Sequence, residues 1–308
     1  MKVLVTGATG FLGQALVSRL LEADHDVIAS LHRHVPPQQH PSLHWRKLDL
    51  SDPHSDCSEL VAGVALIYHL AWSKVPSEAD RELAEDARVN IVGSLRLIEA
   101  LRSMARPPHI VFASSGGTVY GVLSQIPAPE DHPLRPISAH GVSKRAVEAY
   151  LEMMSRERGL QAVSLRMGNV YGPGQGIERP FGAVAHFAHM ALAGKPIRIF
   201  GDGSTTRDYL YIDDAVDALI CAGLGSGQGN YNVGTGIGHS LSDIVAIIAT
   251  HLGRDVPLDR HPSRAFDVPV SILDASRARR TFGWVPQVRL EDGIAKTLHH
   301  LQGLGPGS

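Results

Sequence analysis

The stretch KVLVTGATGFLG, residues Lys2–Gly13, decides the fold of this chain. Its apolar, β-branched beginning predicts a buried strand over Lys2–Thr6, and the apolar spacing that follows predicts a helix over Phe11–Ala23. Glycines fill the turn between them, where they let the backbone approach a pyrophosphate, and the helix N-terminus attracts the same anion. We therefore predict the phosphate cradle of a dinucleotide site, formed by Gly7, Gly10, Phe11, Leu12 and Gly13.

Five more apolar, β-branched runs follow, at Asp26–Ser30, Leu43–Leu48, Ala65–Leu70, His109–Ala113 and Ala162–Met167. Amphipathic segments of helical length separate several of them. This alternation is typical of a parallel sheet that helices cover on both faces. The sequence therefore predicts an α/β fold, a doubly wound parallel (Rossmann) sheet.

The texture of the sequence changes after Tyr171, where loops rich in glycine and proline interrupt the helical stretches. We predict a dinucleotide-binding domain over residues 1–166 and a smaller, mainly substrate-binding C-terminal region over residues 167–308. This prediction leaves open whether parts of residues 210–236 pack with the first domain.

Charge, cysteine count and histidine spacing limit the kinds of partner that the chain is expected to bind. With 29 Lys and Arg against 31 Asp and Glu, the formal charge of −2 gives no bulk electrostatic reason to bind nucleic acid or an anionic membrane. The two cysteines have no metal-site or disulfide spacing, and the N-terminus runs straight into a strand, so a reducing, cytoplasmic setting is expected. Four histidines in His32–His44 are irregularly spaced and lack carboxylate partners, so no metal site is predicted there.

The end of the second strand leaves the choice between NAD and NADP open. An acidic residue there would hold the adenosine ribose of NAD, but Ser30 and Leu31 occupy this place. Arg33, two residues further on, has a guanidinium that can pair with the 2′-phosphate of NADP. Asp49, after the third strand, is placed to meet the adenine amine.

Several motifs in order resemble those of the extended short-chain dehydrogenase/reductase family, and within it the UDP-glucose 4-epimerase-like nucleotide-sugar epimerases. The motifs are TGATGFLG (6–13), HLAW (69–72), RVNIVGS (88–94), SSGGTVYG (114–121), GNVYGPG (168–174), FGDGSTTRDYLYIDD (200–214), YNVGTG (231–236) and FGWVP (282–286). The resemblance runs nearly end to end. It implies a doubly wound α/β fold, NAD or NADP as cofactor, and a nucleotide-diphosphate sugar as substrate.

The resemblance also implies residue roles. Lys144 is expected to hold the nicotinamide ribose, and Leu50, Leu70, Ala71 and Asn90 match other cofactor positions. Asn169, Arg207 and Arg264 match residues that contact the diphosphate of a UDP- or dTDP-linked sugar, and guanidinium groups suit phosphate oxygens. Relatives commonly dimerise through two helices, which predicts a homodimer through the helices near residues 84–101 and 144–156.

Two departures from the family pattern concern the catalytic residues. The family carries a tyrosine four residues before its lysine, and here His140 stands in that place, on the same helical face as Lys144. The usual catalytic Ser or Thr falls on Gly116, and Ser115 and Thr118 are the hydroxyls close by. A neutral imidazole can accept a proton near pH 7, but it reaches less far than a phenol.

The function expected from the resemblance is an NAD(P)-dependent epimerisation of a nucleotide-diphosphate sugar through a transient keto sugar. C4 is the leading position for this epimerisation. His140 is then the acid/base, an altered residue that leaves turnover poor, or a histidine without a catalytic part. Two alternatives stay open: an NADPH-dependent reductase of nucleotide-linked 4-keto sugars, and a protein that binds dinucleotide or nucleotide sugar without turnover. Gly117 and Thr118 stand where the family's dehydratases have acidic residues, which disfavours a dehydratase.

Overall fold

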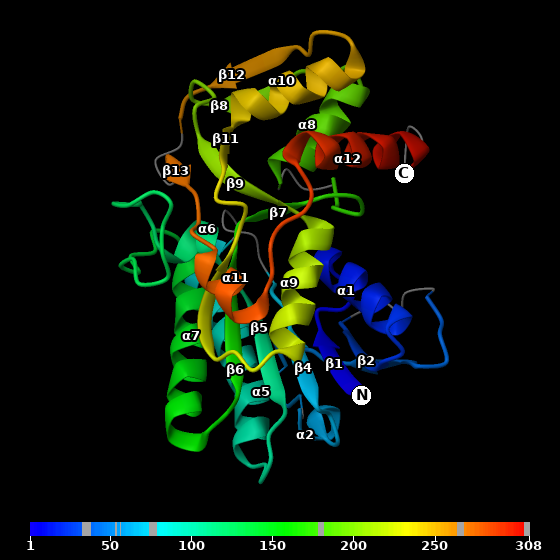
Figure 1. The fold of residues 1–308 in the computed structure, drawn as a ribbon, viewed down its shortest axis with the longest axis vertical. Helices are drawn as coiled ribbons and strands as arrows, with labels where there is room; N and C mark the ends of the chain where they lie inside the picture. Colours follow the sequence, from blue (N-terminus) through cyan, green and yellow to red (C-terminus); the bar gives the residue numbers. More distant parts are fainter. Residues whose placement is uncertain are drawn as a thin grey trace.

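The computed structural model describes residues 1–32, 38–52, 54–55, 57–73, 79–177, 182–263 and 268–304. Its N-terminal part alternates strands and helices (Figure 1): β1 (Lys2–Thr6), α1 (Phe11–Glu22), β2 (Asp26–Leu31), β3 (Leu43–Lys47), α2 (Ser58–Val61), β4 (Leu66–His69), α4 (Leu83–Asp86), the π-helical η1 (Ala87–Val92), α5 (Gly93–Arg102), β5 (His109–Ser115), α6 (Gly116–Val119), α7 (Ala139–Arg158) and β6 (Ala162–Met167). Each strand predicted from the sequence is present, with ends that differ by at most two residues.

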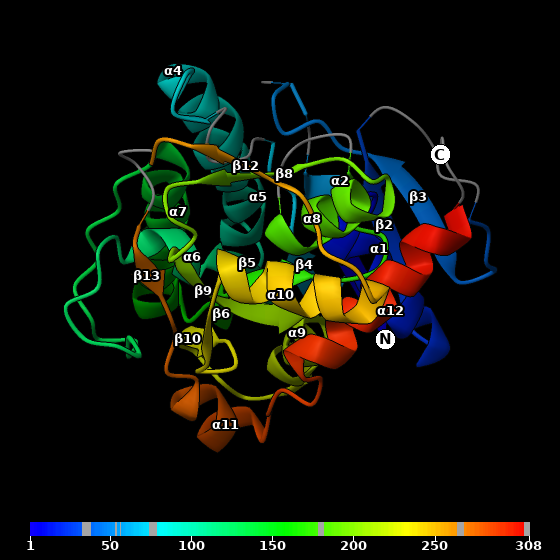
Figure 2. The same cartoon turned by 90° about the horizontal axis from the view of Figure 1, so that it is seen from above.

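The rest of the chain has shorter strands. Its elements are β7 (Asn169–Tyr171), α8 (Ala183–Leu192), β8 (Ile197–Phe200), β9 (Thr206–Tyr211), α9 (Ile212–Leu224), β10 (Gly229–Val233), β11 (Gly238–Ser240), α10 (Leu241–Leu252), β12 (Leu258–His261), β13 (Val270–Ser271), α11 (Ser276–Phe282) and α12 (Leu290–Leu304). Helices α8, α10 and α12 pack together above the large sheet, beside the parallel pair β8 and β12 (Figures 1 and 2).

Seven parallel strands form the large sheet, in the order β10-β6-β5-β4-β1-β2-β3. The chain runs outward from β1 to β3 and then starts again on the other side with β4. The order therefore reverses between β1 and β4, and the crevice at the carboxyl ends of these strands is where a doubly wound sheet binds its ligand. The prediction of a doubly wound α/β fold is confirmed.

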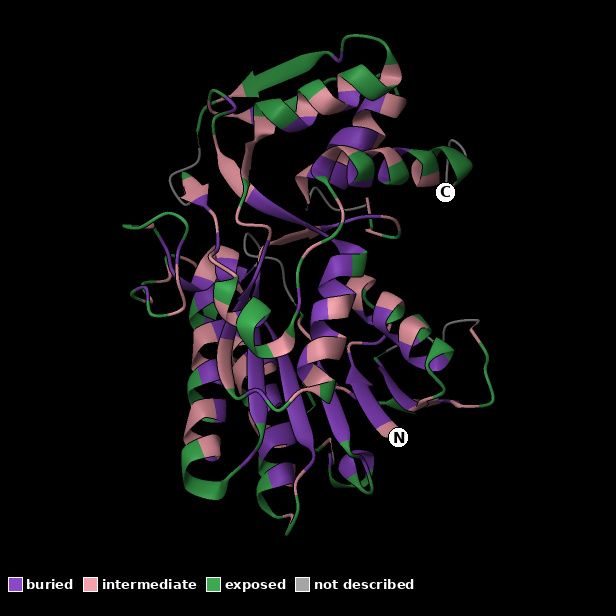
Figure 3. Cartoon of the chain, viewed as in Figure 1, coloured by how far each residue is buried: buried purple, intermediate pink, exposed green. Residues whose placement is uncertain are grey.

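Alternate residues of the central strands enter two separate cores. Val3 and Val5 of β1 join the core that contains α1 and α9, whereas Leu4 between them joins the core that contains α5 and α7. This follows from the two-residue period of a strand. The inner strands of the large sheet are accordingly buried along most of their length, while the helices that cover it expose one side (Figure 3).

Segments after residue 167 contribute to both halves of the molecule. β10 pairs in parallel with β6 at the edge of the large sheet, and α9 packs against α1. β9 meanwhile pairs with β7, β11 and β13 in the smaller sheet. The proposed boundary between residues 166 and 167 stays a prediction.

Candidate functional site

The glycine turn at the end of β1 has the shape of an anion cradle. Gly7 has a φ of +70°, and a Cβ atom there would lie 2.7 Å from the backbone nitrogen of Ala71. A Cβ on Gly13 would lie only 2.2 Å from the carbonyl oxygen of Gly7, so α1 begins directly against the turn. The N-cap, Gly10, supplies no side-chain acceptor, which leaves the first-turn N–H groups for an anion. These features fit the pyrophosphate of a dinucleotide.

A chain of hydrogen bonds fixes the strand ends beside this cradle. The pKa of buried His69 is lowered to about 3 by desolvation and by the charge of Lys144, so its ring is neutral. Since the Ser94 hydroxyl donates to the carbonyl of Asn90, it accepts from Nε2 of His69, 2.8 Å away. Nδ1 then accepts from the Thr6 hydroxyl at 2.8 Å, and that oxygen accepts from the backbone amides that follow β4, those of Leu70 and Ala71.

Substituting Gly13 with alanine should weaken dinucleotide binding. Because the new Cβ would overlap the carbonyl oxygen of Gly7, α1 must move away from the turn, and we expect the dissociation constant of NAD to rise by about tenfold or more, which is about 1.4 kcal/mol or more. Titration calorimetry measures this. Gly303→Ala is the matched control because nothing lies within 4 Å of its Cβ position. Equal NAD affinity in both variants would contradict the placement of the cradle.

The end of β2 offers the ribose no carboxylate among the residues that the structure describes. Leu31 is buried, and the Ser30 hydroxyl accepts from the backbone amide of Gly7 at 3.0 Å. His32 lies 3.1 Å from Asp49, whose pKa is lowered to about 2, first by the Ser51 hydroxyl. Asp49 is thus ionised and engaged, and Arg33 lies outside the described residues.

Asn90 and Leu50, two of the predicted cofactor residues, make contacts within the chain. The amide of buried Asn90 donates to Asp86, and its oxygen accepts from the backbone and hydroxyl of Ser73, so it anchors the loop after β4. Leu50 packs against Gly93, where a Cβ would lie 2.7 Å away. Phe11 and Leu12 are partly buried in the first turn of α1.

Helix α7 presents His140 and Lys144 on one face. Ser138 caps its first turn by accepting from the amide of Gly141, and Gly159, with a φ of 67°, ends it. Lys144 is only 6% exposed and donates to the carbonyl of Ala113 at 2.6 Å. Burial lowers its pKa to about 7, against the charges of Glu148 and Asp86, which raise it.

His140 sits one turn before Lys144 and contacts Thr118. Its Nδ1 lies 3.3 Å from the Thr118 hydroxyl, and its ring meets the indole of Trp72 edge-on at 5.8 Å. Burial, and then the charge of Lys144, lower the pKa of His140 to about 3. The imidazole is therefore neutral at physiological pH and able to accept a proton.

Gly116 cannot carry the missing hydroxyl in this fold without rearrangement. A Cβ there would lie 2.5 Å from Leu273 and point into that side chain. Gly117 instead faces polar groups, since its Cβ position is 3.4 Å from the amide oxygen of Asn169 and 4.0 Å from the hydroxyls of Ser115 and Ser271. Ser115, beside Gly117, directly precedes α6, and Thr118, whose hydroxyl contacts His140, lies within α6.

Two of the three predicted diphosphate residues come together in the smaller sheet. Asn169 begins β7 and pairs with Tyr209, while Arg207 lies two residues earlier on the same strand, β9. Arg207 donates to the carbonyl of Thr206 at 2.9 Å. Arg264 falls outside the described residues.

A buried ion pair joins α7 to β6. Arg166, 1% exposed, donates to both oxygens of Glu148, which is fully buried, and also donates to the hydroxyl of Tyr120. The Ser114 hydroxyl donates to Glu148 as well. The tyrosine nearest to the site in sequence, Tyr120, is held in this network and donates to Asn232, so it does not substitute for the missing family tyrosine.

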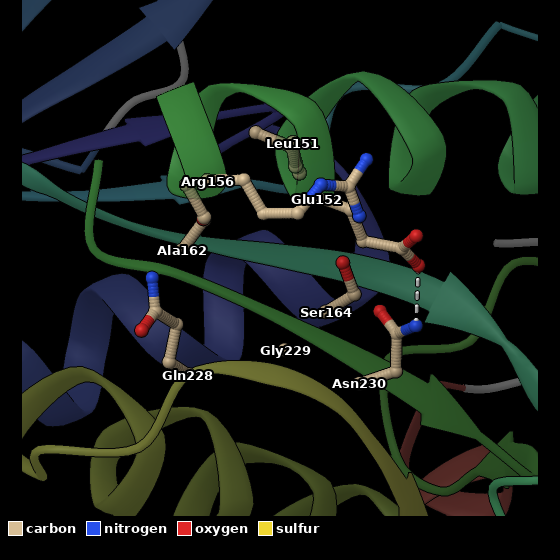
Figure 4. A pocket seen from close by; sticks show the side chains of 9 residues that line it. Leu151, Glu152, Arg156, Ala162, Ser164, Gln228, Gly229 and Asn230 are labelled. Atoms are coloured by element: carbon tan, nitrogen blue, oxygen red, sulfur yellow. Dashed lines mark hydrogen bonds between the residues drawn. The ribbon is translucent and has the colours of Figure 1, made fainter. Parts of the chain in front are cut away.

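A pocket of about 330 Å³ lies elsewhere, between α7, β6 and the edge strand β10 (Figure 4). Glu152, Ser164 and Asn230 line it, and the Asn230 amide donates to Glu152 at 2.7 Å. None of the predicted site residues lines this pocket. In the part of the chain that the structure describes, we find neither a group of three or more metal-ligating side chains nor a helix long and apolar enough to cross a membrane.

A sequence profile of the NAD dependent epimerase/dehydratase family matches residues 3–234. The chain belongs to this family. It is 40% identical over 311 residues to a UDP-glucose 4-epimerase of Mycolicibacterium smegmatis, with 97% of each chain covered. A UDP-glucose 4-epimerase of Thermotoga maritima, solved with UDP-glucose, superposes with a TM-score of 0.93 at 34% identity, covering 99% of both chains. A Thermus thermophilus UDP-glucose 4-epimerase in complex with NAD gives 0.91 at 33% identity over 98% of this chain and 99% of the other.

The epimerase/dehydratase fold also brings two side chains to the site that sequence reasoning missed. Trp72, at the end of the HLAW motif, contacts both Lys144 and His140. Ser271, on the two-residue strand β13, lies beside Gly117 and pairs with Arg207. An aromatic residue at the carboxyl end of a central strand was a usable signal for Trp72, whereas nothing local in the sequence marks Ser271.

Proposed function

We propose that this protein is an NAD-dependent 4-epimerase of a UDP-linked sugar. The observation that carries the proposal is the placement of Lys144 and His140 on one face of α7, with Thr118 in contact with the imidazole, at the carboxyl ends of the strands next to the glycine cradle. The nearly full-length likeness to UDP-glucose 4-epimerases supports the substrate class and the position of epimerisation.

Gly7, Gly10 and Gly13 would hold the pyrophosphate of NAD, and Lys144 its nicotinamide ribose. The nicotinamide, when bound, supplies the acceptor and donor of hydride. Asn169, together with Arg207 and Arg264, would hold the substrate diphosphate. The sugar is then free to turn at its keto stage while its diphosphate stays fixed.

His140 would take the proton of the C4 hydroxyl and return it after the sugar has turned. With Nδ1 protonated, the imidazole donates to Thr118 and accepts the proton at Nε2. With Nδ1 free, the Thr118 hydroxyl donates to it and accepts from the sugar, so threonine relays the proton. A base whose pKa burial lowers to about 3 takes the proton only as the C4 carbonyl forms.

The test uses NAD-loaded protein with no further nicotinamide cofactor in the solution. Its conversion of UDP-glucose that carries deuterium at C4 is followed by NMR. We expect UDP-galactose that retains the deuterium at C4, because the same hydrogen is removed and returned. Loss of deuterium to solvent, or no product from NAD-loaded protein with any of a panel of UDP- and dTDP-sugars, would contradict the proposal.

A second candidate is an NADPH-dependent reductase of a nucleotide-linked 4-keto sugar. Leu31 favours it, because this apolar side chain stands where a carboxylate would select NAD against the 2′-phosphate of NADP. This reductase would consume NADPH in equal amount to a 4-keto substrate, whereas the epimerase needs none. The absorbance of NADPH separates the two.

We also propose that the protein forms a homodimer through α4, α5 and α7. Leu83 of α4, Val92 of η1, directly before α5, and Val142 and Tyr150 of α7 expose 63%, 41%, 52% and 40% of their surface. These segments pack against one another, and a second copy of the chain would cover the exposed apolar side chains. Light scattering coupled to size exclusion should give twice the chain mass of 33.1 kDa.

A further inference from the structure

Lys144 rests on an aromatic surface. Its Nζ lies 3.6 Å from the ring centroid of Trp72 and 4.8 Å from that of Phe112, and the carbonyl of Ala113 is its hydrogen-bond acceptor. An ammonium over an indole face is attracted by the negative face of the ring, and more strongly when water is excluded. Trp72 therefore contributes directly to holding the charge of a side chain that is 6% exposed.

The same indole also touches the second side chain of the site. Its ring centroid lies 5.8 Å from that of His140, at an interplanar angle of 69°, and 5.9 Å from that of Phe112. Trp72 thus contacts both the lysine and the histidine. The imidazole is smaller than the tyrosine ring of the family, so an indole beside it supplies contact that the histidine alone does not.

We propose that Trp72 is a positioning residue, which holds the Lys144 ammonium on its indole face and fixes His140 beside it. The inference rests on the proposed function only in so far as Lys144 and His140 are the pair that it positions. The charged and titratable groups around Lys144 are Glu148 and His140 of α7, Asp86 of α4 and His69 of β4.

The direction of the expected pKa change at Lys144 follows from the cation–π contact with Trp72. The indole favours the protonated lysine, so its removal lowers the lysine pKa, while a leucine in its place keeps the neighbouring surface apolar. The chain has six lysines, and labelling their Cε atoms with ¹³C lets each titration be followed by NMR. We expect Lys144 to titrate near pH 7 in the natural protein and on the order of one pH unit lower in Trp72→Leu.

Three comparisons accompany this variant. Trp72→Phe keeps an aromatic face and should restore most of the shift, and Trp45→Leu, on β3 at the far side of the sheet, should leave the midpoint unchanged. Site-specific 5,6,7-trifluorotryptophan at residue 72 keeps the ring shape but weakens its negative face, so it should lower the midpoint even if Trp72→Leu does not fold. Signals are assigned with Lys144→Met.

A Lys144 midpoint that trifluorotryptophan leaves unchanged or raises would overturn the proposal. Turnover is read separately: if a UDP-sugar is converted, Trp72→Leu should lower kcat by about tenfold or more with little change in KM, and Trp72→Phe should recover most of it. An absence of turnover in the natural protein would remove the proposed function, whereas the lysine titration would still decide the role of Trp72.

Discussion

Replacing Lys144 with methionine is expected to lower kcat for sugar epimerisation by about 10²- to 10⁴-fold. The Lys144 ammonium lies one turn after His140 on the same face of α7, and methionine has a similar volume without a charge or a donor. NMR-monitored conversion of the UDP-sugar measures the loss. Titration of NAD should show weaker binding at the same time, because the lysine would also hold the nicotinamide ribose.

Loss of folding is not expected to explain the lower kcat of Lys144→Met. Burial of the Lys144 ammonium is unfavourable, as its lowered pKa shows, so the methionine variant should have an unfolding free energy equal to or above that of the natural protein. Lys195→Met, at an exposed position, is the matched control and should keep full activity. A Lys144→Met protein with more than a tenth of the natural kcat would contradict the role given to this residue.

Replacing Arg166 with methionine is expected to cost about 3 kcal/mol of unfolding free energy. The substitution leaves the carboxylate of Glu148 fully buried with one hydroxyl donor, Ser114, after the loss of its two guanidinium contacts at 3.0 and 2.8 Å. Arg145, 3.6 Å away, partly compensates the charge, so the cost should lie at the lower end of the range for broken buried pairs. Urea unfolding followed by circular dichroism measures it.

The double variant Arg166→Met, Glu148→Leu should recover most of this loss, because neither charge is then left buried. Arg19→Met is the surface control. It breaks an ion pair with Asp217 at 2.8 Å whose side chains are 41% and 42% exposed, and should cost at most about 1 kcal/mol. If Arg166→Met and Arg19→Met cost the same, the buried pair is not the support of α7 that the structure indicates.

The sequence was most informative where function depends on backbone shape. Gly7, Gly10 and Gly13 predicted the strand, the turn and the helix together, because only residues without a side chain fit the close approaches seen at Gly7 and Gly13. The strands followed from two-residue or continuous apolar patterns, and their parallel arrangement from the alternation with helices. The placement of His140 and Lys144 on one helical face followed from their spacing.

Contacts between residues that meet only through the fold were beyond prediction. Asp208 follows Arg207, the predicted diphosphate contact, yet it accepts hydrogen bonds from Thr235, Gly236 and Leu273 and joins three segments of the chain. The contact of Trp72 with Lys144 joins residues 72 positions apart in the sequence. Gly116 was read as a lost hydroxyl, whereas the structure shows Leu273 in the space that its side chain would enter.

The central claim is that His140 and Lys144 form a working catalytic pair, and His140 tests it most directly. NMR would follow the conversion of UDP-glucose by the NAD-loaded protein, by His140→Phe and by His140→Tyr, side by side. The account predicts turnover by the natural protein and a loss of about 10²-fold or more in His140→Phe, which keeps a ring beside Trp72 but removes the proton acceptor. Turnover by His140→Tyr alone would contradict it, and would leave a protein that binds dinucleotide and nucleotide sugar without converting them.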